Sequence, residues 1–150
     1  MVLTNELYFA YSSNLDPIQM KDRVGEWISS ERVHAEGYKR VFNVKSRRWG
    51  GWAANLKKTD SIADKSYGVV YEITKQQLDT MTGFEGIEPV SISVKTENGQ
   101  ELKDVKAYIW EKEEQSHEPP ADYKKSIITG LEQHDYDPEV IKRVQKEFYP

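Results

Sequence analysis

The sequence predicts an α+β fold, with strands through most of the chain and two helices at its end. Short runs rich in Val, Ile and Tyr, of which residues 67–73 (YGVVYEI) are the clearest, are typical of strands. The pair Asn98-Gly99 between two alternating runs indicates a tight hairpin. Apolar residues at helical spacing after residue 120 indicate the helices. At 150 residues, the chain predicts one domain over 1–150 with a core of its own.

Composition excludes several classes of protein. The chain has no cysteine, which excludes disulfides, thiolate zinc sites and cysteine nucleophiles. A net charge of −4 gives no electrostatic reason to expect nucleic acid or an anionic membrane as a partner. No run approaches the roughly 20 apolar residues of a membrane span, and residues 1–11 lack the pattern of a secretory signal. We therefore expect a cytoplasmic protein with neither partner.

The first expected unit is a strand, a tight turn and a short helix. Residues 7–11 (LYFAY) form an apolar run that predicts a buried strand. Residues 12–14 (SSN) are turn formers. Asp16 then stands as an N-cap before Pro17 at the first helical position, and Gly25 is a plausible end of the helix.

That turn is the first segment with chemical meaning. A strand that ends in a turn and opens a helix points several backbone N–H groups into one spot, where they can hold a carboxylate or an oxyanion. Asn14 can brace such a turn through its side chain. On spacing alone, an ordinary connection between a strand and a helix is the simpler interpretation of residues 8–15 (YFAYSSNL).

The remaining elements are predicted from the spacing of apolar residues and from the positions of capping and turn-forming residues. A short helix is expected after its cap at Thr74, with Leu78 and Met81 on its inner face and Gly83 at its end. A charged, proline-rich stretch at 111–122 predicts an exposed loop. Further strands are expected at 37–45, 52–56, 67–73, 90–95 and 105–110, with a loop at 46–51 and a polar connection at 59–65.

Two helices are expected after the exposed loop. The first covers about residues 122–134, and the second starts at Asp137-Pro138. The residues expected to be buried at helical spacing are Tyr123, Ile127, Ile128 and Leu131 on the first and Val140, Ile141, Val144 and Phe148 on the second.

Glu85 is the second residue of chemical interest. It lies between Phe84 and Gly86, directly after the expected end of the helix. A carboxylate beside an aromatic and a flexible glycine can be partly desolvated yet reachable, which raises its pKa and makes its ionised form a better base. From chemistry alone, a solvated glutamate in a turn is the simpler interpretation.

Two other patterns favour structural interpretations. Arginines interleaved with tryptophans in residues 45–52 (KSRRWGGW) could bind nucleic acid, but the cluster is isolated in an acidic chain, so packing of a loop explains it better. His34, His117 and His134 show no metal-ligand spacing, so no metal site is expected. The sequence also lacks a glycine-rich nucleotide-binding motif.

Together these segments resemble the γ-glutamylcyclotransferase-like family, which includes γ-glutamylamine cyclotransferase-type proteins. The order and spacing agree over nearly the whole chain. The matching segments are residues 8–15 (family YFAYGSNL), 49–54 (WGGWAA; family WxGGxA), 67–73 (family GVV followed by Trp or Tyr), 83–86 (GFEG; family ExxEG) and 119–127 (PPADYKKSI; family PPSxxYKK).

The resemblance implies a small mixed β-barrel with surrounding helices and one cavity at the barrel mouth. It implies Glu85 as the catalytic base, with Tyr123 able to line the site, although Tyr123 also lies on the apolar face of its helix. Ser12 stands where the family has glycine, a residue that tolerates positive φ and lets a ligand approach the backbone. The implied substrate-binding residues are Tyr11, Ser12, Ser13, Asn14, Leu15 and Tyr123.

The implied reaction is intramolecular, of the transferase or lyase type found in glutathione metabolism. The α-amine of a γ-glutamyl group attacks its own γ-carbonyl, closes a five-membered ring, and releases 5-oxoproline with an amine or amino acid. No metal or organic cofactor is needed, because the substrate itself supplies proximity. Two alternatives stay open: a non-catalytic protein that binds a small ligand on the same fold, and a different leaving group. The sequence separates neither the leaving groups nor the oligomeric states.

Overall fold

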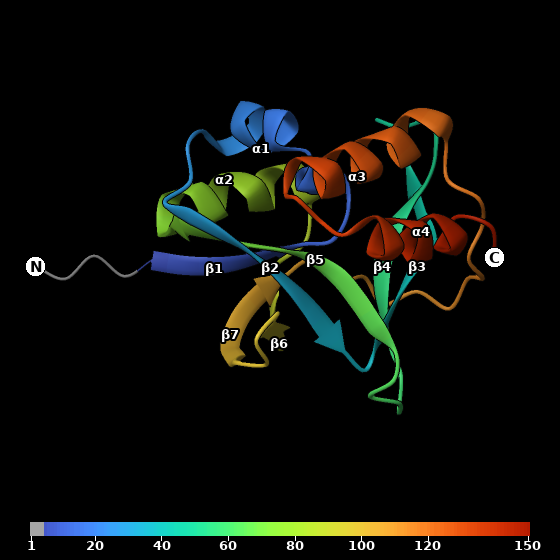
Figure 1. The fold of residues 1–150 in the computed structure, drawn as a ribbon. Coiled ribbons are helices and arrows are strands. Elements are labelled where there is room, and N and C mark those ends of the chain that lie inside the picture. Colours follow the sequence, from blue (N-terminus) through green and yellow to red (C-terminus); the bar gives the residue numbers. More distant parts are fainter. Residues whose placement is uncertain (1–4) are drawn as a thin grey trace, which may run out of the picture.

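The computed structural model describes residues 5–150, in which groups of strands are separated by helices and the last two elements are helices (Figure 1). The first four residues, part of the segment in which no secretory signal was expected, lie outside this range. The elements are β1 (Asn5–Ala10), the 3₁₀ turn η1 (Ser13–Leu15), α1 (Pro17–Val24), β2 (Ser29–Glu36), β3 (Tyr38–Ser46), β4 (Gly51–Lys58), β5 (Lys65–Thr74), α2 (Lys75–Glu85), β6 (Val90–Thr96), β7 (Glu101–Ala107), α3 (Ala121–Gln133) and α4 (Pro138–Glu147).

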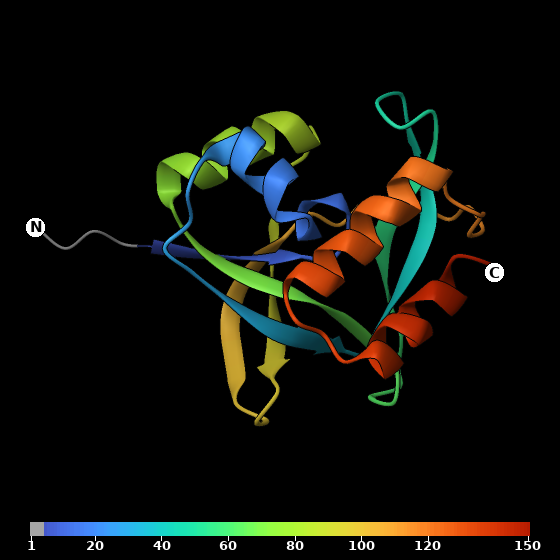
Figure 2. The same ribbon diagram turned by 45° about the horizontal axis from the view of Figure 1, so that its top comes forward.

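Five strands close into a barrel in the order β1-β5-β2-β6-β7. The barrel is mixed because β1 pairs with β7 in parallel, whereas its pairing with β5 is antiparallel. Helices α1 and α2 lie side by side at one end, while α3 and α4 lie toward the other end, beside β3 and β4 (Figures 1 and 2). The predicted α+β fold with a small mixed barrel and surrounding helices is therefore confirmed.

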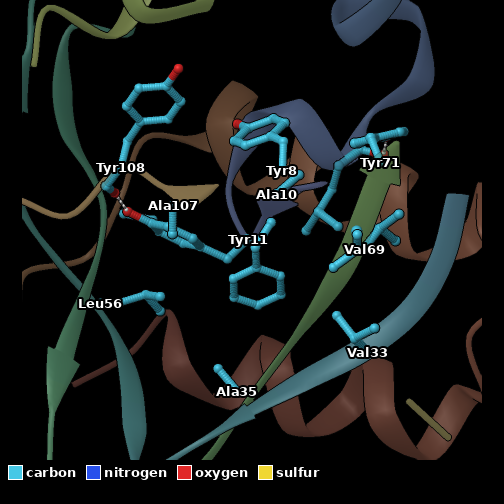
Figure 3. Close-up of a cluster of buried hydrophobic side chains, with 14 of the residues drawn as sticks. Tyr8, Ala10, Tyr11, Val33, Ala35, Leu56, Val69, Tyr71, Ala107 and Tyr108 are labelled. Atoms are coloured by element: carbon cyan, nitrogen blue, oxygen red, sulfur yellow. Dashed lines mark hydrogen bonds between the residues drawn. The ribbon is translucent and has the colours of Figure 1, made fainter. Parts of the chain in front are cut away.

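The barrel interior is filled by side chains of several strands. Figure 3 shows Tyr8 of β1 beside Tyr71 of β5, while the side chain of Tyr11 extends toward Ala107 and Tyr108. Burying one such apolar or aromatic side chain stabilises a fold by about 1.5–3 kcal/mol. The hydroxyl of Tyr11 donates to the backbone carbonyl of Tyr108 at 2.5 Å, which satisfies a polar group inside the core.

Strands β3 and β4 form a separate two-stranded ribbon beside the barrel. The register shifts between Phe42 and Val44, and the side chain of Asn43 is buried there. Asn55 on β4 donates to the carbonyl of Trp110 at 2.8 Å and accepts from its N–H at 2.9 Å. These bonds attach the ribbon to the segment that leaves the barrel, so the ribbon is held as one wall of a cavity.

Helix α2 ends later than expected. Thr74 caps it as predicted, and Gln77 completes a capping box with the backbone of Thr74. The expected end at Gly83 is wrong, because Gly86 supplies the left-handed conformation, with φ 79°, and its N–H bonds the Thr82 carbonyl at 2.9 Å. Glu85 is consequently the last residue of α2, not part of a turn after it.

Other differences have simple physical reasons. Strand β2 was not expected, because only Val33 and Ala35 on it are buried and the alternation is short. The return strand of the hairpin starts at Glu101 instead of 105, since its first residues are mostly exposed. On the two last helices, Ile128, Val140 and Ile141 are only partly buried, while the other expected core residues are buried. No helix in residues 5–150 is long and apolar enough to cross a membrane.

Candidate active site

A cavity of about 220 Å³ lies where η1, the β3–β4 ribbon and the end of α2 meet. A larger hollow of about 450 Å³ lies between β3, β5 and α4, away from that turn. Residues from both segments of chemical interest in the sequence, the turn after β1 and the end of α2 with Glu85, line the smaller cavity. It is lined by Ser12, Ser13, Arg23, Val44, Lys45, Ser46, Arg48, Trp49, Ala53, Ala54, Phe84, Glu85, Trp110 and Tyr123.

Glu85 reaches this cavity from the C-terminal end of α2. Its side chain is 16% exposed, so the interpretation as a solvated glutamate does not hold. Its Oε1 accepts from Nδ2 of Asn14 at 3.2 Å and lies 3.8 Å from Nη1 of Arg23. Burial raises the pKa of the Glu85 carboxyl, while Arg23, the hydrogen bond from Asn14 and Arg48 lower it, and the net direction is upward.

Asn14 is the centre of a buried hydrogen-bond network that holds the turn against α1 and α2. Its side chain is fully buried and its Nδ2 donates to the hydroxyl of Tyr8 at 2.8 Å as well as to Glu85. Its Oδ1 accepts from Nε2 of Gln19 at 3.0 Å and from Nη1 of Arg23 at 3.1 Å. These four partners fix the side-chain orientation of Asn14 and place the turn beside the carboxylate.

The backbone around η1 leaves N–H donors unbonded, and two of them belong to the lining residues Ser12 and Ser13. The N–H of Leu15 bonds the Ser12 carbonyl and that of Asp16 bonds the Ser13 carbonyl, each at 3.1 Å. Among the described residues, no protein acceptor bonds the N–H groups of Ser12, Ser13 or Asn14. Ser12 has a φ of −127°, so this position does not use the positive φ that a glycine would allow.

Helix α3 supports the turn from behind. The hydroxyl of Ser126 donates to the Ser13 carbonyl at 3.2 Å. A Cβ at Gly130 would lie 2.3 Å from the carbonyl carbon of Leu15, so only glycine allows this close approach. Leu15 is fully buried in this contact and, like Tyr11 and Asn14, does not line the cavity. The structure therefore brings Ser12, Ser13 and Tyr123 to the cavity surface and places the other three expected residues behind it.

The two tyrosines of the predicted site have different places. Tyr123 lines the cavity, packs edge-on against Trp49 at 5.1 Å and accepts from the N–H of Ala54 at 2.7 Å. Burial raises the pKa of Tyr123 to about 12, although hydrogen bonds with Ala54 and Ser12 lower it. Tyr11 is held from both ends: its hydroxyl bonds Tyr108, and its carbonyl accepts from Nε of Arg40 at 2.8 Å.

Sequence reasoning missed the cationic side chains of the cavity. Arg23 on α1 is 8% exposed, and the guanidinium carbons of Arg23 and Arg48 lie 5.2 and 5.4 Å from the ring centre of Phe84. The spacing of Gln19 and Arg23 could have indicated Arg23, because residues four apart share a helix face. Arg48 belongs to the segment that the sequence analysis assigned to loop packing, and Trp49 does pack there.

The chemistry available in the cavity is proton transfer and anion binding. Glu85 is the only carboxylate among the lining residues, and amide, hydroxyl and guanidinium donors surround it. Within residues 5–150 no group of three His, Asp or Glu side chains is placed to hold a metal ion.

Neither models of known protein families nor curated proteins match this chain. Solved structures do. A structure named gamma-glutamyl cyclotransferase aligns with a TM-score of 0.82 and 23% identity, over 95% of this chain and 87% of that one. An uncharacterized protein from Homo sapiens aligns with a TM-score of 0.81 and 24% identity, over 94% and 86%.

A gamma-glutamyl cyclotransferase specific to glutathione from yeast aligns more distantly, with a TM-score of 0.68 and 11% identity over 97% of this chain and 96% of that one. The chain therefore has the γ-glutamyl cyclotransferase fold, which confirms at the level of the fold the resemblance seen in the sequence motifs.

Proposed function

We propose that this protein is a γ-glutamylcyclotransferase that releases 5-oxoproline from a γ-glutamyl amino acid or amine, in the cytoplasm and without a metal or organic cofactor. One observation carries the proposal. A largely buried carboxylate, Glu85, and the unbonded N–H groups of Ser12 and Ser13 in the turn lie at the same small cavity although about 70 residues separate them. The fold shared with gamma-glutamyl cyclotransferase structures supports the same reaction.

Glu85 is the general base in this proposal. The substrate's α-amine arrives as an ammonium group, so a proton must leave before the nitrogen can attack the γ-carbonyl carbon. The ionised Glu85 takes that proton, and the raised pKa of its carboxyl makes it a stronger base than an exposed glutamate. When the bond between the γ-carbon and the leaving nitrogen breaks, Glu85 returns a proton to that nitrogen, and the second proton of the ring nitrogen passes to the departing amine, which leaves as an ammonium.

The turn stabilises the oxygen that gains charge. Attack on the γ-carbonyl places a negative charge on its oxygen, and the unbonded N–H groups of Ser12 and Ser13 at the cavity would stabilise that charge. Tyr123 adds a hydroxyl at the same wall, and with a pKa of about 12 it keeps its proton at neutral pH. Ser12, Ser13 and Asn14 would then act mainly through the backbone, with Tyr11 and Leu15 behind them.

A second candidate is a protein that binds a γ-glutamyl-like ligand without turnover. Ser12 favours it, because a hydroxymethyl group stands at the cavity where the family has a hydrogen. This side chain takes space beside the position proposed for the reacting carbonyl.

A mass-spectrometric assay of 5-oxoproline release from a library of γ-glutamyl compounds tests the proposal. We expect release by the wild type with and without a chelator, and almost none by Glu85→Gln. Release from no compound, together with saturable binding of a γ-glutamyl ligand by calorimetry, would establish the second candidate. Loss of turnover on chelation, restored by one divalent ion, would contradict a metal-independent reaction.

A further inference from the structure

The larger hollow of the protein, the β3–α4 hollow, lies between β3, the start of β5 and α4 and has a volume of about 450 Å³. Sites that hold drug-sized ligands have volumes of about 300–1,000 Å³, so this hollow has room for an organic molecule. It shares no lining residue with the candidate active site. An occupant of the β3–α4 hollow is therefore a second ligand and not the substrate of the proposed reaction.

The charge of the β3–α4 hollow is opposite to that of the whole protein. Five cationic side chains and two carboxylate side chains line it, although the protein has a net charge of −4. The cations are those of Lys39, Arg40, Lys65, Arg143 and Lys146, and the carboxylates are those of Asp64 and Glu147. Like charges in one hollow repel each other, and its walls of low dielectric constant focus their potential on an approaching anion.

Only one of the five cations is neutralised within the protein. The side chain of Arg40 is fully buried and donates to both carboxylate oxygens of Glu147, at 2.8 and 3.1 Å. The other four lining cations form no ion pair with any carboxylate of residues 5–150. They are exposed and come from β3, β5 and α4, which are far apart in the sequence. The fold thus gathers four unpaired cations whose donors are available to a ligand.

The remaining lining of the hollow is largely apolar. Val144 is buried there, and Val41 and Tyr67 are half-buried. The hydroxyl oxygen of Ser116 accepts from the N–H of Phe42 at 2.8 Å, and its own hydrogen has no acceptor among residues 5–150. Apolar side chains with a few convergent polar groups are typical of sites for organic ligands. The lining therefore combines apolar surface with exposed cations.

We infer that the β3–α4 hollow binds a small organic molecule with an apolar body and at least two negative charges, of the class of the phosphate monoesters. Its charged group lies among Lys39, Lys65 and Arg143, since a guanidinium binds phosphate through two parallel hydrogen bonds. Its apolar body lies against Tyr67 and Val144. This inference goes beyond the proposed function and does not depend on it.

Phenyl phosphate, inorganic phosphate and phenol test the two parts of this ligand separately. Each is titrated into isotope-labelled protein at about pH 8, where the phosphate group has lost its second proton, and the amide shifts are followed by two-dimensional NMR. We expect phenyl phosphate to cause saturable shifts at the hollow, for example at Lys65, Tyr67 and Val144. Inorganic phosphate should bind there with a higher Kd, and phenol should not saturate in the same range.

Two double variants with the same change in net charge provide a matched comparison. Lys39→Gln combined with Lys65→Gln removes two cations of the hollow and should weaken the binding of phenyl phosphate by about 3–30-fold, because each exposed ion pair contributes a few-fold. Lys103→Gln combined with Lys112→Gln removes two exposed lysines that line neither cavity, and it should leave the Kd unchanged. The spectra of both variants also show whether they fold.

The inference is overturned if phenyl phosphate causes no saturable shifts, or if its Kd is unchanged in the variant of Lys39 and Lys65. Shifts centred on Ser12, Ser13 and Glu85 would overturn it too, because they would place the anion in the candidate active site. An equal Kd for phenyl phosphate and inorganic phosphate would contradict the apolar part of the ligand. These measurements involve no turnover, so their failure leaves the assay of 5-oxoproline release as a separate test of the proposed function.

Discussion

The protein buries two arginines near carboxylates, and the two pairs differ in how completely the arginine is bonded. Arg40, whose side chain is fully buried, donates to both carboxylate oxygens of Glu147 at 2.8 and 3.1 Å and to the carbonyls of Tyr11 and Tyr67. Arg23 has one hydrogen bond, to Asn14, and a carboxylate at 3.8 Å. The first guanidinium is satisfied on all three nitrogens, whereas the second has an unpartnered Nε.

We propose that this difference separates a structural role from a functional one. When the arginine of a buried ion pair uses all its donors within the protein, none is left for a ligand. Removing one partner of such a pair leaves the other charge buried without compensation. An incompletely bonded pair at a cavity holds its donors and its base for a molecule that is not part of the protein. The following predictions test whether stability and activity divide between the two pairs in this way.

The largest expected effect is on the activity of Glu85→Gln. Glutamine is nearly isosteric and can still accept from Asn14, but it cannot accept the amine's proton. A positioned general base contributes about 10²–10⁴-fold, so we expect a loss of that order in kcat/KM for 5-oxoproline release.

Glu88→Gln is the control, because Glu88 is an exposed acid three residues further along the chain. It should retain nearly the full rate. A wild-type rate in Glu85→Gln together with an inactive Glu88→Gln would assign the base to the other carboxylate.

The next effect is on the stability of Arg40→Met. Removing one partner of a buried ion pair typically costs about 3–5 kcal/mol, and here two backbone carbonyls lose donors as well. We expect a loss of that size in urea denaturation. Arg23→Met should cost much less, because Arg23 contributes a single hydrogen bond. Equal losses in the two variants would remove the distinction between the pairs.

The pH dependence of stability gives a smaller effect. Because burial raises the pKa of Glu85 in the folded protein, the folded state holds this proton more tightly than the unfolded chain does. The contribution of Glu85 to the free energy of unfolding is therefore fully present below the pKa of the unfolded chain, about 4.3. It is lost as the pH rises through the pKa of the folded protein. Urea titrations from about pH 4 to 7 should show the stability of Glu85→Gln rising relative to wild type, by about 1.4 kcal/mol for each pH unit that separates the folded pKa from the unfolded one. A constant difference across this range would mean that the pKa of Glu85 is the same in both states.

Ser12→Gly should have the smallest effect. Since Ser12 does not use a positive φ, glycine changes no backbone requirement, and turnover should be preserved or raised a few-fold. Glycine's greater freedom in the unfolded chain should lower the stability by about 0.5–1 kcal/mol. Steady-state kinetics and thermal melts measure both. Markedly weaker substrate binding by a folded variant would make the Ser12 hydroxyl itself a specificity determinant.

Local signals predicted most of the fold. The capped starts at Asp16 and Thr74 and the apolar run of β5 are determined by neighbours in the chain, and the structure confirms them. Strand β2 was not predicted, because its sequence shows little alternation of buried and exposed residues. It is a strand because of its tertiary pairing with β5 and β6. The end of α2 was misplaced because two glycines were available and only the fold decides which one takes the left-handed conformation.

The site was predictable only in part. Motif resemblance indicated Glu85 and the Ser12–Asn14 turn, and the structure places Glu85, Ser12 and Ser13 at one cavity with Asn14 behind them. Arg23 and Arg48 look like surface arginines in a linear sequence, since nothing local shows that α1 and the β3–β4 turn face the same aromatic ring. Arg40 was missed for the same reason, because its three acceptors come from distant parts of the chain.

The supports behind η1 have a consequence for the order of events during synthesis. Residues from Ser12 to Glu85 supply the turn and the carboxylate, but the turn rests on Ser126 and Gly130, and Arg40 needs Glu147. A nascent chain grows from its N-terminus at about 5–20 residues per second, so these supports arrive after the turn and the carboxylate. We expect the turn and the Glu85 carboxylate to reach their final arrangement only once residues 126–147 are free to fold, so a chain that lacks them should not form the candidate site.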